Sequence, residues 1–161
     1  ALDLMDLNIG DKVCDLYGGV GLFTMGISEI IGENGYVYLV ESDDYATKDA
    51  RKIFKNHKNV LVRKGRVEKE LPLVDSVDVI LLDPPRNGAG SLVVDQMVSK
   101  KPRTIVYVSC DPASLARDTK LLLENNYSLD KIIAIDLFPM THHIECVAKF
   151  KQTTNLPKKS G

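Results

Sequence analysis

Short apolar runs alternate along the chain with longer amphipathic segments, and this alternation predicts the fold. Runs rich in β-branched and aromatic residues are typical of buried strands, and they lie at residues 12–17, 36–41, 60–62, 77–82 and 104–109. The segments predicted as helices lie at residues 22–31, 44–56, 91–99 and 113–125. Two further apolar runs, at residues 129–138 and 144–150, are predicted as strands.

The connections between these elements predict how the strands pair. Helices between successive strands favour a right-handed parallel α/β sheet. The last two strands are separated only by residues 139–143, whereas a parallel crossover needs about a dozen residues. We therefore expect a doubly wound, mostly parallel seven-stranded sheet whose last strand is antiparallel.

Both ends of the chain fall outside this predicted sheet. Residues 1–9 carry apolar residues at helical spacing and are predicted as a short amphipathic helix. Residues 153–161 lack apolar anchors. Because 161 residues fit one domain, we expect a single domain over residues 1–150 and a loose tail over residues 151–161.

The composition narrows the class of protein. Hydrophobic residues make up 44% and charged residues 27%, which is ordinary for a globular protein. No apolar run approaches the roughly 20 residues that span a bilayer, and no signal peptide opens the chain. Cys14, Cys110 and Cys146 lie far apart, which argues against a disulfide framework, a zinc site or an iron–sulfur site. We expect a cytoplasmic protein with reduced thiols, without a membrane partner and without a metal.

The charge distribution leaves one local question open. A net charge of −1 excludes a globally basic nucleic-acid binder. Lysine and arginine nevertheless cluster between Lys48 and Lys69. A solvated helix and loop is the commoner interpretation of such a run, and contact with RNA is the alternative.

A cysteine stands where the fifth strand meets the following helix. Asp111 suits the N-cap of that helix and Pro112 its first position, so the thiol of Cys110 faces the positive end of the helix. That field favours the thiolate, which is the nucleophilic form. A small buried hydrophobe is the other common role of a cysteine. This stretch alone leaves both interpretations open.

A glycine-rich turn follows the first strand, at residues 15–21. Glycines let the backbone approach a ligand, and the next helix offers free N–H groups. Glu41 ends the second strand, where a carboxylate can bind both ribose hydroxyls. Thr24 replaces the third glycine of a dinucleotide motif, which favours S-adenosyl-L-methionine. The predicted cofactor-binding residues are Asp15, Tyr17, Gly18, Gly19, Gly21, Leu22, Glu41 and Asp83.

Two further segments complete the candidate site. Asp83-Pro84-Pro85-Arg86 follows the fourth strand, where two prolines stiffen the backbone and Arg86 could bind a phosphate. The alternative for this segment is a plain proline-rich turn. Near the last strand, Glu145 is predicted to act as a base in the same crevice as Cys110. A metal site built from His142, His143 and Glu145 is disfavoured because no further ligand is evident.

Together and in this order, residues 15–21, 83–86, 109–112 and 143–145 are specific to one enzyme family. The sequence from residue 13 to residue 150 resembles the catalytic domain of the RNA uridine-5-methyltransferases, which make 5-methyluridine in tRNA and ribosomal RNA. The resemblance implies a Rossmann-like class I methyltransferase fold and S-adenosyl-L-methionine as the cofactor.

The resemblance also implies a role for each candidate residue. The Cys110 thiolate would attack C6 of a uridine, C5 would take the methyl group, and Glu145 would remove the C5 proton. Asp83 would hydrogen-bond near the uracil or the cofactor, and Arg86 and His143 would contact the substrate. Because a stacked base is out of reach of Cys110, the target would be flipped or already unpaired.

The family usually carries an N-terminal RNA-binding domain and a central domain, and neither is part of this sequence. We therefore expect weak binding of tRNA or ribosomal RNA, by a monomer. Two alternatives stay open, an amino-directed nucleic-acid methyltransferase and a non-catalytic module that binds the cofactor. The first of these would need no cysteine nucleophile, and the second would bind the cofactor without transferring a methyl group.

Overall fold

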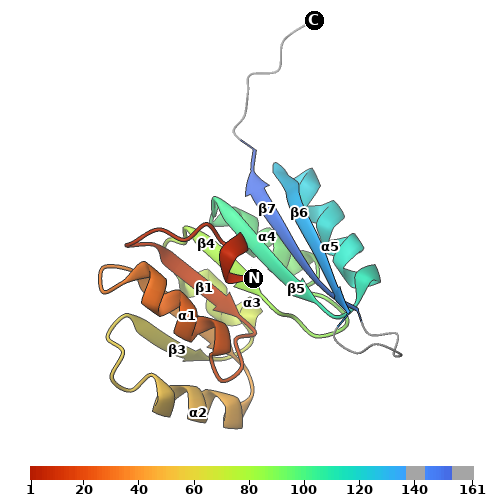
Figure 1. The fold of residues 1–161 in the computed structure, drawn as a ribbon. Coiled ribbons are helices and arrows are strands. Elements are labelled where there is room, and N and C mark those ends of the chain that lie inside the picture. The colour runs from red at the N-terminus through yellow and green to blue at the C-terminus, as the bar shows by residue number, and fades with distance from the viewer. Residues whose placement is uncertain (137–143, 154–161) are drawn as a thin grey trace, which may run out of the picture.

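A twisted seven-stranded sheet runs through the protein (Figure 1). The computed structural model describes residues 1–136 and 144–153. The strand order is β3-β2-β1-β4-β5-β7-β6. The strands are β1 (Lys12–Leu16), β2 (Tyr36–Glu41), β3 (Val60–Lys64), β4 (Val79–Leu82), β5 (Thr104–Ser109), β6 (Tyr127–Asp136) and β7 (Ile144–Gln152). Strands β1 to β5 pair in parallel, and β7 is antiparallel to both β5 and β6.

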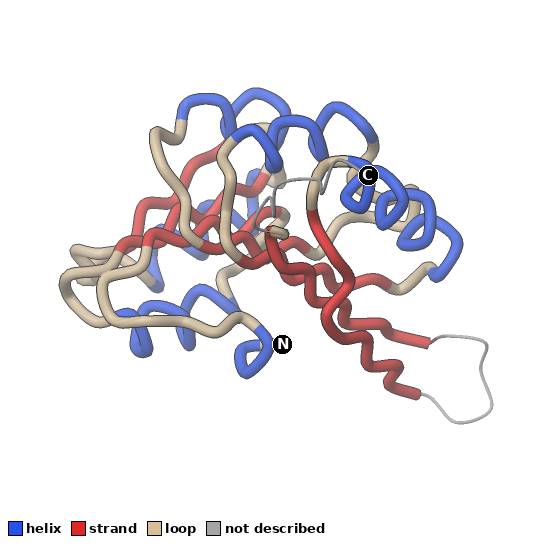
Figure 2. The backbone as a smooth tube through the Cα atoms, turned by 90° about the horizontal axis from the view of Figure 1, so that it is seen from above, coloured by secondary structure: helices blue, strands red, loops and turns tan. Residues whose placement is uncertain are grey.

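Helices cover both faces of the sheet (Figure 2). The helices are α1 (Leu22–Ile31), α2 (Asp44–Ile53), α3 (Val67–Glu70), α4 (Ser91–Ser99) and α5 (Pro112–Glu124), with short 3₁₀ turns η1 (Leu2–Leu4) and η2 (Leu71–Leu73). Residues of η1 and α1 share one buried cluster with the sheet, and residues of α3, α4 and α5 share another on the opposite face. Within the described residues, no helix has the length and apolar character needed to cross a membrane.

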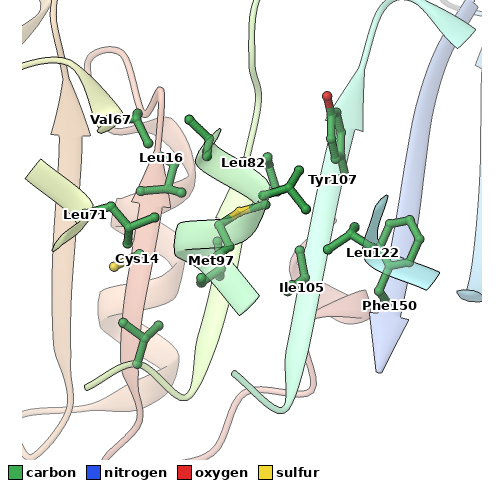
Figure 3. Packing of buried hydrophobic residues seen from close by; sticks show 14 of the residues in the cluster. Cys14, Leu16, Val67, Leu71, Leu82, Met97, Ile105, Tyr107, Leu122 and Phe150 are labelled. Atoms are coloured by element: carbon green, nitrogen blue, oxygen red, sulfur yellow. The ribbon is translucent and has the colours of Figure 1, made fainter. Parts of the chain in front are cut away.

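The larger of the two clusters fixes β4 and β5 against α4 and α5. Leu82, Met97, Tyr107, Leu122 and Phe150 all belong to it and are fully buried (Figure 3). Burial of side chains of this size contributes roughly 1.5–3 kcal/mol each relative to exposure. The ends of β4 and β5, where the candidate residues lie, are therefore held by a rigid core.

The strand order brings the carboxyl ends of the parallel strands to one edge. The chain runs outward from β1 to β2 and β3, and then returns to place β4 on the other side of β1. Such a reversal leaves a crevice at the carboxyl ends, where open α/β sheets bind ligands. The turn after β1, the end of β2, the loop after β4 and the residue after β5 all meet at this edge.

The sheet confirms the predicted fold class, and the bounds of several central elements are those predicted from the sequence. The predicted helices at 22–31 and 91–99 and strands at 36–41 and 104–109 have the bounds of α1, α4, β2 and β5. The tail prediction differs, because β7 continues through Gln152.

The predicted helix over residues 1–9 was wrong. Only η1 forms there, and Asp6 adopts a positive φ of 51°, which a helix cannot accommodate. The Asp6 carboxylate instead accepts a hydrogen bond from Lys149 Nζ at 2.6 Å. The guanidinium of Arg103 donates to the Asp6 carbonyl at 2.8 Å. These tertiary contacts override the local helical pattern.

Candidate active site

The turn between β1 and α1 is built by residues with positive φ. Tyr17 has a φ of 60°, Gly19 of 56° and Gly21 of 95°. Glycine is required at position 21 for a second reason, since a Cβ there would lie 2.3 Å from a ring carbon of Phe54. By contrast, a Cβ at Gly19 would meet nothing within 4 Å, so the backbone there borders open space.

Glu41 ties the end of β2 to this turn. One carboxylate oxygen accepts a hydrogen bond from Gly19 N at 3.0 Å. The other accepts from Ser42 N at 2.6 Å and Asp43 N at 2.7 Å. These three N–H donors hold the carboxylate in one place beside the glycine turn.

A pocket of about 190 Å³ opens next to Glu41. Its walls come from the turn after β1, the end of β2, the segment after β3 and the loop after β4. They are formed by Tyr17, Val40, Glu41, Ser42, Gly65, Arg66, Val67, Glu68, Pro85, Asn87, Gly88 and Ala89. The predicted residues Tyr17 and Glu41 therefore share one pocket, whereas Leu22 at the start of α1 is exposed.

From the sequence, adenine contacts are expected around Gly65 to Glu68, but no single residue there can be chosen. The segment holds no motif, and it directly follows β3 at the same edge of the sheet as Glu41. Its position at a carboxyl end explains why all four of its residues line the pocket.

Asp15, predicted as a cofactor ligand, is buried near the base of the turn. Its carboxylate accepts a hydrogen bond from Thr24 Oγ1 at 2.6 Å. The pKa of Asp15 is raised to about 6. Burial is the largest cause, and the negative charges of Asp83 and Glu41 contribute smaller parts of the same rise. Asp15 does not line the pocket, so its contact with a cofactor stays a prediction.

Replacing Asp15 with asparagine is expected to stabilise the protein at neutral pH. The folded protein holds a proton on Asp15 up to about pH 6, whereas the unfolded chain releases it near 3.8. Wild-type stability therefore falls as the pH rises through this window. Asparagine resembles the protonated form, so Asp15→Asn should match wild type near pH 4 and exceed it by up to about 3 kcal/mol at pH 7.

Urea unfolding from pH 4 to pH 8 measures this difference. Asp3→Asn, at an exposed position, is the control. We expect the difference between its free energy of unfolding and that of wild type to stay constant with pH. A stability difference between Asp15→Asn and wild type that stays constant with pH would contradict the prediction.

The carboxyl groups of Asp83 and Glu145 lie close enough to interact electrostatically. Asp83 directly follows β4, and its N–H donates to the Leu16 carbonyl at 3.2 Å, which fixes it against β1. Although part of the side chain is exposed, burial of its carboxyl group raises the pKa of Asp83. The second cause of that rise is the negative charge of Glu145. The carboxylates predicted from two distant segments thus share one region.

Cys110 follows β5, the strand that lies between β4 and β7. The register pairs Ser109 with Cys146. Cys110 directly follows Ser109, and Glu145 directly precedes Cys146 in β7, so both lie one position beyond this pair at the same edge of the sheet. Asp83, Cys110 and Glu145 therefore lie at the ends of three neighbouring strands, β4, β5 and β7.

The start of α5 forms as predicted. The carboxylate of Asp111 accepts a hydrogen bond from Ser114 N at 2.7 Å, and Pro112 takes the first helical position. Hydrogen bonding from Ser114 lowers the pKa of Asp111, and the nearby charges of Arg117 and Arg86 lower it further. The half-buried Cys110 therefore lies at the positive end of a capped helix, with Arg86 near the same end.

The two other cysteines pack in the core, as expected. Cys14 is fully buried, and burial raises the pKa of its thiol to about 12. Cys146 is 6% exposed, and burial raises the pKa of its thiol too. His143, predicted to contact the substrate, lies outside the described residues. Among the described residues, no group of three His, Cys, Asp or Glu side chains could hold a metal ion.

Comparison with known proteins places this geometry in a family. Residues 62–153 match the family described as tRNA (Uracil-5-)-methyltransferase. An uncharacterized RNA methyltransferase of Streptomyces avermitilis is 47% identical over 141 residues, which are 86% of this chain and 33% of that protein. The 23S rRNA (uracil(1939)-C(5))-methyltransferase RlmD of Shewanella denitrificans is 36% identical over 96% of this chain and 34% of its own length. The chain thus spans about a third of the curated relatives it matches.

Solved structures agree. The Pyrococcus abyssi tRNA (uracil-54, C5)-methyltransferase, in complex with S-adenosyl-L-homocysteine, has a TM-score of 0.75 and 33% identity, over 92% of this chain and 36% of its own. The precorrin-6y C5,15-methyltransferase of Geobacter metallireducens shares the fold, with a TM-score of 0.79 at 13% identity, over 93% of this chain and 84% of its own. On the match of more than half its residues, the chain belongs to the tRNA (uracil-5-)-methyltransferase family.

Proposed function

We propose that residues 1–150 form a catalytic domain that transfers a methyl group from S-adenosyl-L-methionine to C5 of a uridine in RNA. The observation that carries this proposal is the position of Asp83, Cys110 and Glu145 at the ends of three neighbouring strands, at the edge that also holds the Glu41 pocket. A thiol and a carboxylate at one edge would supply the nucleophile and the base that substitution at C5 of uracil requires.

The pocket beside Glu41 fits an adenosine-type cofactor. The backbone borders open space at Gly19, and Glu41 Oε2, which accepts only from Gly19 N among the three N–H groups, can accept a further hydrogen bond from a ribose hydroxyl. Tyr17 and the segment from Gly65 to Glu68 would line the nucleoside. When bound, S-adenosyl-L-methionine supplies an electrophilic methyl group. The Pyrococcus relative, solved with S-adenosyl-L-homocysteine, supports this assignment.

The residues at the edge would act on uracil in sequence. The Cys110 thiolate adds to C6, and the electron pair of the C5–C6 double bond makes C5 a nucleophile that takes the methyl group. Glu145 then removes the C5 proton, the double bond forms again, and the sulfur leaves as thiolate. Asp83 would hydrogen-bond to the uracil or the cofactor.

The substrate would be a flipped or unpaired uridine of tRNA or ribosomal RNA. Arg86, exposed near the start of α5, would contact a phosphate beside the target, and His143 would contact the nucleotide. Because the chain spans about a third of its curated relatives, we expect this domain to bind RNA weakly.

Methyl-group tracing tests the proposal. The protein is incubated with S-adenosyl-L-methionine labelled on its methyl group and with tRNA and ribosomal RNA from a strain that lacks uridine C5 methylation. We expect label in 5-methyluridine after digestion to nucleosides. Label on an exocyclic amine would instead support an amino-directed enzyme, and cofactor binding without any transfer would support a non-catalytic module.

Replacing Glu41 with alanine is expected to weaken cofactor binding by about 10- to 100-fold. Charged hydrogen bonds contribute roughly 1.5–3 kcal/mol, and each 1.4 kcal/mol is about tenfold in affinity. Calorimetry with S-adenosyl-L-homocysteine measures the effect. Glu41→Gln, which keeps one acceptor, should lie between, and Glu33→Ala, at an exposed position in the turn after α1, should bind as wild type does. An unchanged affinity in Glu41→Ala would contradict the ribose assignment.

A further inference from the structure

A buried carboxylate on α5 holds the loop that follows β4. Asp118 is completely buried. One of its oxygens, Oδ2, accepts hydrogen bonds from Ala89 N at 2.8 Å, from the Tyr107 hydroxyl at 2.8 Å and from Gly90 N at 3.4 Å. The Tyr107 hydroxyl also accepts from Ala89 N at 3.2 Å. Figure 3 shows this hydroxyl beyond the carbon side chains of the core cluster.

The loop approaches α5 too closely for any side chain to intervene. Gly88 has a φ of 80°, and a Cβ there would lie 2.6 Å from Asp118 Oδ2 and 2.7 Å from Arg117 Nη2. Arg117 Nη2 also donates to the Asn87 carbonyl at 2.5 Å. We call Asp118, Tyr107 and the loop backbone from Asn87 to Gly90 the α5 clamp.

The α5 clamp also places a carboxylate at the start of α4. The N-cap of α4 is Gly90, which has no side chain to accept from the first turn. Asp118 supplies a carboxylate at this point, where the positive end of α4 favours negative charge. A buried charge is stable only while its donors stay in place. Displacing the loop would remove these hydrogen-bond donors from the buried carboxylate, which is unfavourable in free energy, so the loop is held in one position.

The α5 clamp joins two parts of the candidate active site. At one end, the N-cap of α5, Asp111, directly follows Cys110. At the other end, the held loop continues from Asp83 and Arg86, and its residues from Asn87 to Ala89 form a wall of the pocket beside Glu41. A shift of this loop relative to α5 would change the distance between the thiol and the cofactor pocket.

We propose that Asp118 is a positioning residue that fixes the loop after β4, and with it the cofactor pocket, relative to Cys110. This inference rests on the proposed function and names a residue that takes no part in the chemistry. Asp118 shares the buried face of α5 with Ser114, Leu115 and Leu122. A carboxylate on an otherwise mostly apolar helical face is the sequence signal for it.

Single-turnover methyl transfer at saturating cofactor and RNA tests the proposal. A misplacement of about 1 Å can lower a rate about 100-fold, so Asp118→Asn should lower the rate constant by about this factor. Tyr107→Phe, which leaves the carboxylate bond to Ala89 N, should lower it less, by about tenfold. Because both act through one loop, the double variant should be no slower than Asp118→Asn alone.

The matched control is Leu122→Ala, which opens a cavity one turn along the same buried face without touching the loop. At a temperature where all variants are folded by circular dichroism, its rate should stay within about threefold of wild type. If Asp118→Asn is no slower than Leu122→Ala while wild type is active, the inference is overturned and the proposed function stands. If wild type itself transfers no methyl group to uridine, it is the proposed function that fails.

Discussion

Replacing Cys110 with alanine is expected to lower methyl transfer to uridine by more than about 10⁴-fold. Loss of a covalent nucleophile removes a step that the remaining groups cannot perform, and such losses are among the largest that single substitutions produce. Without sulfur on C6, C5 of uracil stays a poor nucleophile. Asp83 and Glu145 cannot replace the thiolate, because a carboxylate is a much weaker nucleophile toward C6. Single-turnover transfer of a labelled methyl group measures the effect.

Trapping on RNA that contains 5-fluorouridine isolates the thiol's own step. Once the methyl group has passed from S-adenosyl-L-methionine to C5, fluorine leaves no proton there for the base to remove, so the sulfur bonded to C6 remains attached. Wild-type protein should migrate with the RNA on a denaturing gel, and Cys110→Ala should not. Cys146→Ala is the matched control, because that cysteine is buried in β7 within the larger core cluster, and it should still be trapped. Full activity in Cys110→Ala would favour the amino-directed alternative.

Replacing Glu145 with glutamine is expected to lower turnover by about 10²- to 10⁴-fold, the range for loss of a general base. The first steps need only Cys110 and the methyl donor, so the methyl group should still reach C5. The protein should then remain bonded to the methylated RNA, because nothing removes the C5 proton. A stable adduct formed on ordinary uridine is the result that separates this variant from Cys110→Ala.

Mass spectrometry of the trapped complex measures this accumulation. The control is Glu124→Gln at the exposed end of α5, which should turn over at the wild-type rate without a lasting adduct. Release of product by Glu145→Gln at the wild-type rate would assign the base to another group. Asp83 would then be the next candidate, because after burial the second cause that raises its pKa is the negative charge of Glu145.

The central sheet could be predicted because local and tertiary preferences agree there. At β2 and β5 the apolar runs, the flanking turns and the burial all favour the same strand bounds. The short connection after β6 limited the last pair to an antiparallel arrangement. By contrast, the conformation of residues 1–9 depends on contacts of Asp6 with Arg103 and Lys149. These residues are distant in the sequence, so no local pattern reveals that they lie nearby.

The candidate site was predictable to the level of strand ends. Topology alone brings the residues after β1, β2, β4 and β5 to one edge, so the motifs at Glu41, Asp83 and Cys110 could be assigned to a common crevice. The α5 clamp was not foreseen, because a single Asp118 within a helix carries no motif. The pocket wall from Gly65 to Glu68 could be located as a segment, but without a motif no single residue in it could be chosen.

The position of β7 has a consequence for how the protein matures. This strand is made last among the seven, yet it lies between β5 and β6 rather than outside them. While the ribosome is still translating the segment before β7, β5 presents an open edge of unpaired N–H and C=O groups, which is a template for aggregation. Insertion of β7 closes that edge of β5 and brings Glu145 to the end of the sheet where Cys110 lies. A nascent chain therefore holds Cys110 and Glu145 at one edge only after β7 has been inserted.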